Sequence, residues 1–314
     1  MLDVARLHGV TVPASMFNLS GLVQVQDKDP MTFSNFLDKF KTLRLFYKSP
    51  DVIHRITQEA IEDAAKDNIR YMELRFTPVA LSRAEGFPLH DVMDWVVMSA
   101  KSASEKYNVK VGLIASVNRH ESHELAEQVA WLAADRIKDG MVGMDLAGNE
   151  AEFKSELFYD MFKEARQAGL HVTIHAGEWG PAENVREAID NLSAERIGHG
   201  VRVMEDKSII ALAKERNILF EVCVTSNYQS GVVKSLPEHP LARMAAAGLK
   251  VTVNTDDPSV SRITLSNEYQ RVCEDLKMSI VVLKKSILNA AQASFLKDDE
   301  KAMVVASLKS ELKL

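Results

Sequence analysis

A histidine and a carboxylate lie close together where a predicted strand ends, in the segment TIHAGEWGPAENVREAI. His175 and Glu178 are three residues apart, in a glycine-containing turn between an apolar run and a helical pattern. Packing alone does not require these residue types at this place. An imidazole can bind a metal ion, and a carboxyl group can hold or transfer a proton. The pair therefore predicts metal-assisted or acid–base chemistry.

Further candidate groups follow other predicted strands. His199 ends the apolar part of RIGHGV, Asp256 and Asp257 end KVTVNTDD, and Gly148 closes MVGMDLAG. Each has a structural explanation when it is taken alone. A histidine at a strand end is more often a hydrogen-bonded structural residue, and Asp-Asp-Pro commonly begins a turn and caps a helix. Titratable groups at equivalent ends of several strands are harder to explain in this way, and together they are typical of a zinc hydrolase site.

The elements that must position these groups alternate along the chain. Amphipathic helical patterns separate short apolar segments, most of which a polar or glycine-containing turn follows, as in parallel strands buried on both faces. Equivalent positions recur at intervals of about one βα unit, such as 30 residues from Asp145 to His175 and 24 from His199 to Cys223. The predicted strands cover residues 69–76, 109–117, 141–148, 171–177, 196–201, 218–226 and 250–257.

Seven strands followed by helices predict an α/β fold of the (β/α)₈ TIM-barrel type that lacks its first strand. A barrel of this kind needs eight strands, and the first residues, MLDVARLHGV, have a helical pattern. No glycine-rich phosphate-binding motif is present to favour an open nucleotide-binding sheet. No linker divides the chain, so we expect residues 1–314 to form one domain. Residues 14–50 precede the first predicted strand and are expected to form a helical lid near the barrel mouth.

The composition argues against several classes of partner. A formal net charge of -6 disfavours nucleic acid or an anionic membrane as the main partner. Apolar runs such as VAWLAA are too short to span a bilayer, and the N-terminal residues lack the apolar region of a secretory signal. Cys223 and Cys273 are too few for a disulfide framework or a cysteine-based zinc site. We therefore predict a cytoplasmic protein that acts on a small molecule, and the sequence does not give its oligomeric state.

The motifs taken together resemble the adenosine deaminase family of the amidohydrolase superfamily. TIHAGE, RIGHGV, CVTSNYQSG, HPL and VNTDDP follow in the order and spacing of that family. YMELRFTP and MDLAGNE resemble its earlier strands, so that the resemblance covers nearly the whole chain. CVTSNYQSG is more similar to the adenosine-specific branch than to the related adenine deaminases.

The resemblance implies a metal site and two groups that handle protons. His175 and Asp256 would be ligands of one Zn²⁺ ion per chain. Glu178 would donate a proton to N1 of the purine, which makes C6 more open to attack by water. His199 would orient the attacking water and help to deprotonate it, and zinc would lower the pKa of that water to about 7.

The resemblance also implies a purine nucleoside as the substrate. Asp257 would accept a hydrogen bond at the N7 edge of the base, and the amide of Gly148 would face N3. The implied reaction is hydrolytic deamination of adenosine, and also of deoxyadenosine, to the inosine product and ammonia, as a step of purine salvage.

The first strand of the family ends in H-x-H-L-D-G, which supplies two further zinc histidines and a ribose contact. No H-x-H occurs in this sequence, so we expect a chain that starts about one strand late and whose activity by itself is in doubt. Two alternatives remain open. A related aminohydrolase acting on adenine or a modified nucleoside would keep the same metal and acid–base residues, and a truncated, non-catalytic barrel would only bind a nucleoside or a partner protein. The other zinc deaminase architecture, with P-C-x-x-C, is excluded because the two cysteines are isolated.

Overall fold

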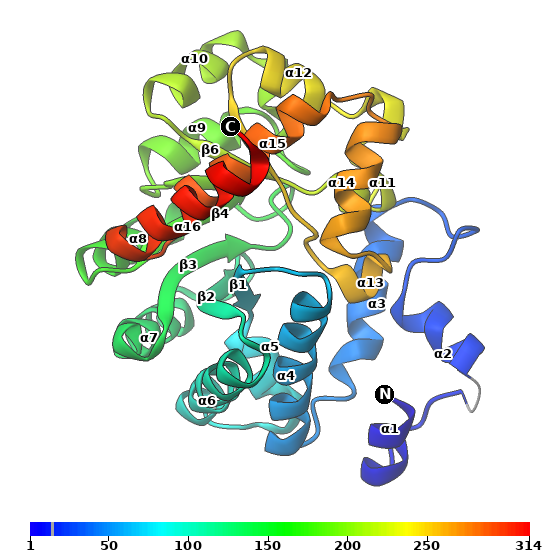
Figure 1. Cartoon of the computed structure of the whole chain (residues 1–314). Helices are drawn as coiled ribbons and strands as arrows, with labels where there is room; N and C mark the ends of the chain where they lie inside the picture. The colour runs from blue at the N-terminus through cyan, green and yellow to red at the C-terminus, as the bar shows by residue number, and fades with distance from the viewer. Residues whose placement is uncertain (14–15) are drawn as a thin grey trace.

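The computed structural model describes residues 1–13 and 16–314, and its centre is a curled sheet of seven parallel strands (Figure 1). The strands lie in the sheet in the same order as in the chain, so every neighbouring pair is joined by a helical crossover. This is the arrangement of a (β/α) half-barrel, whose two end strands are β1 and β7. The strands are β1 (Tyr71–Phe76), β2 (Lys110–Asn118), β3 (Met141–Ala147), β4 (His171–Ala176), β5 (Arg196–His199), β6 (Leu219–Val222) and β7 (Lys250–Val253).

Alternation along the strands sends apolar and polar side chains to opposite faces of the sheet. On β3 and β4, Leu146 pairs with Ile174 and Asp145 pairs with Thr173, and all four residues are fully buried. Because side chains alternate at every residue, Leu146 and Ile174 share one face, which the helices cover, while Asp145 and Thr173 share the interior face. The sheet is therefore apolar towards the helices and polar towards the inside of the half-barrel.

Helices cover the outer face of the sheet. Helices α6 and α7 pack against β2, α8 against β4, and α15 against β7. Several begin at a side chain that accepts a hydrogen bond from the first turn, such as Ser49 before α4 and Ser122 before α7. The helix before β1 is α4 (Pro50–Lys66). The crossover and C-terminal helices are α5 (Pro78–Glu85), α6 (Leu89–Tyr107), α7 (His123–Ala134), α8 (Tyr159–Gln167), α9 (Glu183–Asp190), α10 (Lys207–Glu215), α11 (Val224–Gln229), α12 (Leu241–Ala246), α13 (Pro258–Ser261), α14 (Leu265–Glu274), α15 (Ile280–Gln292) and α16 (Asp298–Leu312).

The predicted α/β fold and all seven parallel strands are confirmed, and the largest differences are at the C-terminal ends of two strands. The predicted strand 218–226 stops at Val222, and helix α11 begins at Val224. The polar side chains of this helix explain the early turn, since Ser226 bonds to Asp256 and Asn227 bonds to His199. The predicted strand 250–257 ends at Val253. The assignment of residues 1–314 to a single domain stays a prediction.

The segment predicted as a lid contains α2 (Met16–Val23) and α3 (Phe33–Arg44), after the N-terminal helix α1 (Leu2–His8). Residues 14 and 15, at the start of the predicted lid, lie outside the described residues. The rest of the segment docks on the chain that follows β7: the amide of Val25 donates to the carbonyl of Val260 at 2.9 Å. Val25, Phe36 and Val260 form a small buried apolar cluster of their own. Figure 1 shows α3 beside α13, in agreement with the cluster that joins Phe36 to Val260.

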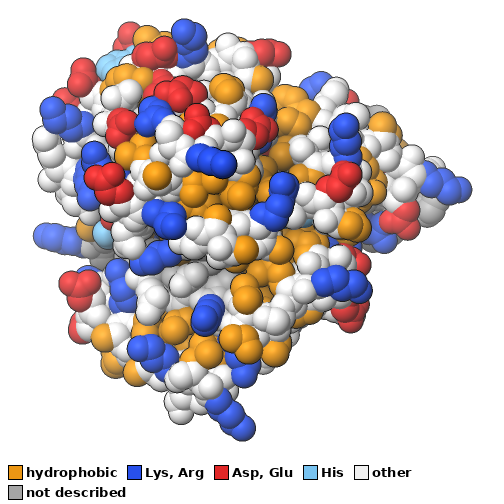
Figure 2. All heavy atoms as spheres, turned by 90° about the horizontal axis from the view of Figure 1, so that it is seen from above, with side chains coloured by type: hydrophobic (Ala, Val, Ile, Leu, Met, Phe, Trp, Pro, Cys, Tyr) orange, Lys and Arg blue, Asp and Glu red, His pale blue; other side chains and the backbone are white. Residues whose placement is uncertain are grey.

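The surface carries charges of both signs. On the face shown in Figure 2, acidic and basic side chains are interspersed with hydrophobic ones, so neither sign covers that face. No helix in the described part of the chain is long and apolar enough to cross a membrane.

Buried charged pairs join distant strands across the interior of the half-barrel. Arg75 on β1 lies 2.7 Å from Glu221 on β6, although these strands are not neighbours in the sheet. Arg196 on β5 bonds to Glu73 on β1, and its Nε lies 2.6 Å from the other oxygen of Glu221. Burial by itself raises the pKa of Glu221, but the charges of Arg196 and Arg75 more than offset this and hold it at about 2. These pairs hold β1 against β5 and β6 and so support the curl of the sheet.

Replacement of Arg196 by methionine should strongly destabilise the protein. The change removes the cation but leaves Glu73 and Glu221 buried, and loss of one partner from such a site costs about 3–5 kcal/mol. The free energy of unfolding, measured by urea denaturation, is the test. Arg55→Met is the matched control, because Arg55 forms an exposed pair with Glu59 on α4 and should change stability by only about 0.5 kcal/mol. Equal effects of the two substitutions would contradict the structural role of the interior pairs.

Candidate active site

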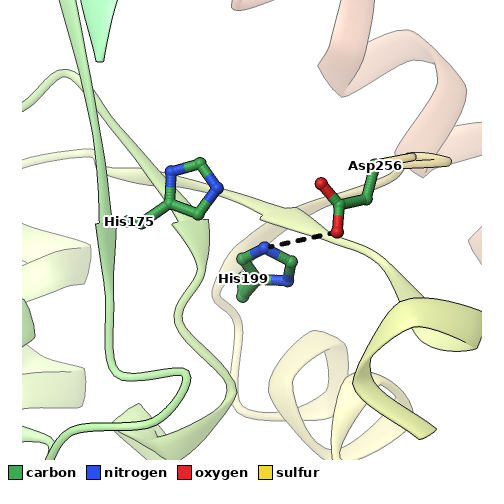
Figure 3. A group of neighbouring side chains, drawn as sticks. All are labelled: His175, His199 and Asp256. Carbon is green, nitrogen blue, oxygen red and sulfur yellow. Dashed lines mark ion pairs between the residues drawn. The ribbon is translucent and has the colours of Figure 1, made fainter. Parts of the chain in front are cut away.

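The C-terminal ends of β4, β5 and β7 bring three predicted site residues together. His175 is the penultimate residue of β4, His199 is the last residue of β5, and Asp256 lies three residues beyond β7. One ligand atom from each of them lies within 4.8 Å of the other two, and the two imidazole centroids are 5.1 Å apart. Figure 3 shows the three side chains converging on one space from separate elements. This is the end of the barrel at which sites of this fold are built.

His175 is fixed by a buried carboxylate behind it. Its Nδ1 donates to Asp145 Oδ1 at 2.9 Å, and the hydroxyl of Ser116 donates to the other oxygen at 2.9 Å. Burial by itself raises the pKa of Asp145, but the charges of Arg75 and His175 outweigh it and hold the pKa at about 2. An ionised carboxylate at Nδ1 leaves the lone pair on Nε2, the nitrogen that faces away from Asp145, as the available metal ligand.

Two of the three residues adopt an uncommon backbone conformation. His199 and Asp256 both have φ near +57°, in the left-handed region that side chains other than glycine rarely occupy. Asp256 is held there by the hydroxyl of Ser226, which donates to Oδ2 at 2.7 Å. The same oxygen lies 4.0 Å from His199 Nε2, so the strained turns direct both side chains to one place. Strain of this kind clusters at functional sites.

These donors fit a divalent metal ion. Two imidazole nitrogens and a carboxylate oxygen are the ligand types that zinc prefers, and the Asp145–His175 pair is typical of a carboxylate behind a metal-binding histidine. Burial lowers the pKa of His199 to about 4, and the charge of Asp256 offsets this only in part, so the imidazole is neutral at physiological pH.

The turn after β4 is held by the side chain of Glu150. Its carboxylate accepts hydrogen bonds from the backbone amides of Gly177 at 2.9 Å, Glu178 at 2.6 Å and Trp179 at 2.6 Å. Gly180 leaves room for these contacts, since a Cβ there would lie 2.1 Å from the side-chain nitrogen of Asn184 and would push that side chain away. Asn184 itself donates to Glu150 at 2.8 Å. One buried carboxylate thus orders the whole turn that carries Glu178.

Glu178 points into the same space as the metal-ligand candidates. One of its carboxyl oxygens lies 3.6 Å from His199 Nδ1, and only 9% of the residue is exposed. Burial raises the pKa of Glu178 well above its ordinary value, and the negative charges of Asp256 and Glu150 raise it further. A carboxyl group in this setting keeps its proton to a higher pH and can deliver it to a bound molecule.

The remaining predicted residues are Asp257 and Gly148. Asp257 directly follows Asp256 and precedes α13, and burial together with the charge of Asp256 raises its pKa well above the ordinary value. Gly148 follows the last residue of β3 with φ +96°. Gly148 lies next to Arg119, because a Cβ added to Gly148 would be 3.4 Å from the backbone nitrogen of Arg119. The guanidinium of Arg119 donates to the carbonyl of His175 at 2.8 Å.

Four residues that support the site were missed as site residues in the sequence: Asp145, Glu150, Ser226 and Asn227. Only Asp145 carries a local signal, because a charged residue interrupts the apolar run of MVGMDLAG. Glu150 and Ser226 are polar residues in loops or helix starts, where polarity is expected in any case. Their importance follows from contacts with residues 27 to 30 positions away.

Comparison with known sequences decides the family. The profile of one family, described as adenosine deaminase, matches residues 1–311. The chain belongs to the adenosine deaminase family. An adenosine deaminase of Erwinia tasmaniensis is 36% identical over 310 residues, which cover 98% of this chain and 92% of that protein. Membership makes the chain a hydrolase that acts on carbon–nitrogen bonds.

Solved structures with the same fold include deaminases named for different substrates. An adenine deaminase from Arthrobacter aurescens superimposes with a TM-score of 0.90 at 26% identity, covering 99% of this chain and 94% of that one. An amidohydrolase from Burkhoderia ambifaria, with bound Zn, gives 0.89 at 26% identity and covers 99% and 85%. An arabidopsis N6-mAMP deaminase gives 0.86 at 27% identity and covers 98% and 92%. The chain is therefore an amidohydrolase-type α/β deaminase whose substrate the likenesses leave open.

Replacement of Glu150 by glutamine should loosen the turn that carries Glu178. Hydrogen bonds to a charged acceptor contribute about 1.5–3 kcal/mol each, and glutamine keeps only one acceptor oxygen for the three backbone amides. We expect the amides of residues 177–179 to exchange with solvent deuterium about tenfold faster or more. Glu152→Gln is the control, because Glu152 is exposed and should leave this exchange unchanged. Unchanged exchange in Glu150→Gln would show that another group orders the turn.

Proposed function

We propose that this chain, once further ligands complete its zinc site, catalyses the zinc-dependent hydrolytic deamination of adenosine, and of deoxyadenosine, to the inosine product and ammonia. The observation that carries the proposal is the buried Glu178, whose raised pKa preserves a proton beside His175, His199 and Asp256. An acid next to a metal-ligand group is what hydrolysis at an aromatic C–N bond requires. The two isolated cysteines are consistent with a cytoplasmic place in purine salvage.

His175 and Asp256 are the proposed zinc ligands in this chain. The hydrogen bond from His175 Nδ1 to Asp145 orients its ring, and the hydroxyl of Ser226 orients the carboxylate of Asp256. When bound, the ion would lower the pKa of a water molecule to about 7 and so supply hydroxide at neutral pH. Catalytic zinc sites normally use three or more protein ligands, so a further ligand is needed beside these two.

Glu178 is the proposed general acid. It gives its proton to N1 of the purine, which draws electrons from C6 and allows the oxygen of water to add at that carbon. One proton of the water passes to N6 as the C6–N6 bond breaks, and the nitrogen leaves as ammonia. The other returns to Glu178, and inosine remains with its carbonyl at C6 and a hydrogen on N1. Glu178 suits this role because burial keeps it protonated and the Glu150 contacts fix its backbone.

The other residues of the site orient water and the base. His199 is neutral and lies between Glu178 and Asp256, where it can orient the attacking water. Asp257 is proposed to face the N7 edge of the purine, and the amide of Gly148 its N3. Glycine at position 148, with φ +96°, would bring the backbone close to a planar ring without a side chain.

A related substrate is the alternative, because likenesses to an adenine deaminase and to an N6-mAMP deaminase are equally extensive. Initial rates on adenosine, deoxyadenosine, adenine and N6-methyl-AMP, followed by ammonia release, separate the candidates. We expect the highest kcat/KM on adenosine. A higher value on either of the last two would reassign the substrate, and release from none of them by zinc-loaded protein would favour a non-catalytic barrel.

The metal content should depend on histidines beyond those in this chain. We expect residues 1–314 alone to retain far less than one zinc ion after dialysis, and a chain preceded by a segment that ends in H-x-H-L-D-G to retain about one and to deaminate adenosine. His175→Ala in the extended chain should lower its zinc content. Stoichiometric zinc and full activity in residues 1–314 alone would show that other residues complete the site.

Glu178→Gln in the extended chain should keep zinc but lose most turnover. A neutral amide cannot deliver the N1 proton, and general acids typically contribute about 10²–10⁴-fold to the rate. The measurements are kcat on adenosine and zinc content by elemental analysis. Glu183→Gln, on the exposed start of α9, is the matched control and should retain both. Near-normal turnover in Glu178→Gln would exclude Glu178 as the acid.

A further inference from the structure

A line of hydrogen bonds runs behind His199, away from the proposed metal ligands. It joins His199 to Asn227 on α11 and then to His239, just before α12. We propose that Asn227 and His239 are positioning residues that fix both the ring orientation and the tautomer of His199. The inference rests on the proposed function for its catalytic consequence, but the tautomer itself can be measured without activity.

The direction of the line is set at its far end by a backbone amide. The amide of Leu241 lies 3.1 Å from His239 Nδ1, and an N–H group can only donate. Nδ1 of His239 must therefore accept, and the hydrogen of this imidazole is on Nε2. Burial lowers the pKa of His239 to about 3, so the ring stays neutral and keeps a single N–H.

The N–H of His239 in turn fixes the orientation of the side-chain amide of Asn227. His239 Nε2–H faces Asn227 Oδ1 at 3.2 Å, so the oxygen of the amide points to His239 and its NH₂ group points to His199. The opposite orientation of the amide would place two donors against each other at His239 Nε2. Asn227 and His239 are 0% and 3% exposed, so solvent could not satisfy the polar groups that a flipped Asn227 amide would leave unpaired.

His199 accepts the last hydrogen bond of this line. Asn227 Nδ2 lies 3.0 Å from His199 Nδ1, which must accept because the amide nitrogen donates. The hydrogen of neutral His199 is thereby placed on Nε2, the nitrogen 4.0 Å from Asp256 Oδ2 and on the site side of the ring. Glu178 also faces Nδ1, but its oxygen at 3.6 Å is beyond hydrogen-bond distance and does not oppose an acceptor there. His199 thus presents an N–H, with a defined direction, to the attacking water. In this tautomer it orients the water and does not take its proton, which narrows the role that the resemblance implied.

The inference gives a role to two residues that the proposed mechanism left unused. Asn227 belongs to CVTSNYQSG and His239 to HPL, and the hydrogen bonds join them to His199 rather than to the proposed ligands His175 and Asp256. Their contact closes a path from α12 through α11 to the end of β5, over residues 199, 227 and 239. Positioning groups behind a reactive imidazole typically change activity by about 10–100-fold.

The direct test reads the tautomer of His199 by ¹⁵N NMR of histidine-labelled protein, with its signals assigned by their loss in His199→Gln. In the unmodified chain we expect the Nε2–H tautomer. Asn227→Asp keeps the size of the side chain but replaces the NH₂ donor with an acceptor, so the proton of His199 should move to Nδ1. Asn191→Asp, the same change at an exposed position, is the control and should leave the spectrum unchanged.

A second pair of variants tests His239 and covers the case in which Asn227→Asp does not fold. His239→Gln retains an N–H donor near the position of Nε2 and should preserve the tautomer of His199, whereas His239→Leu removes the donor and should yield a mixture of tautomers. In the extended chain, kcat on adenosine should fall about 10–100-fold in His239→Leu with little change in KM, and His239→Gln should recover most of it.

Two results would overturn the inference: an unchanged Nε2–H tautomer in both Asn227→Asp and His239→Leu, or equal kcat in His239→Leu and His239→Gln when both are folded. Failure of the proposed function looks different. In that case the unmodified extended chain would not deaminate adenosine, while the NMR signals would still report whether Asn227 and His239 set the tautomer.

Discussion

The hydrogen bond between the buried carboxylate of Asp145 and His175 connects the fold to the site. On the site side, it fixes the imidazole and leaves Nε2 free for a ligand. On the interior side, the same carboxylate lies 3.7 Å from Arg75, which also pairs with Glu221. A carboxylate this deeply buried needs compensating charge and hydrogen-bond donors, so the ionised state of Asp145 depends on the cation that links β1 to β6. The charge of Arg75 therefore stabilises both the carboxylate behind the site and the contact that holds the sheet in its curled form.

Two buried carboxyl groups of the site have pKa values that their neighbours shift in opposite directions. Asp145 faces a guanidinium, an imidazole and a hydroxyl, and its pKa falls to about 2. Glu178 faces the carboxylates of Asp256 and Glu150, and its pKa rises well above the ordinary value. The fold thereby separates a permanent anion, which holds a ligand, from a carboxyl group that can give up a proton. Residue type alone does not distinguish these two roles, since the neighbours decide them.

The sequence predicted the strands and the main site positions because both are local signals. Apolar runs ending in a polar turn identify buried parallel strands, and placing those ends on one edge of a sheet brings His175, His199 and Asp256 together. The two strand ends that were overextended, and the supporting residues Glu150 and Asn227, depend on hydrogen bonds between segments far apart in the chain. A pattern of period two or 3.6 contains no information about such partners. The docking of Val25 on Val260 was unpredictable for the same reason.

The interior ion pairs also bear on the order in which the molecule folds. Glu73 and Arg196 are 123 residues apart in the chain, and Arg75 and Glu221 are 146 apart, whereas neighbouring parallel strands pair over much shorter loops. Closing long loops is entropically unfavourable until intervening elements have formed, so local βα units assemble before these contacts can. Until β5 and β6 reach β1, the charged side chains of β1 remain hydrated, and no ion pair across the interior holds the sheet in its curled form. We therefore expect the proposed site around Asp145 to become ordered late in folding, once β5 and β6 have reached β1.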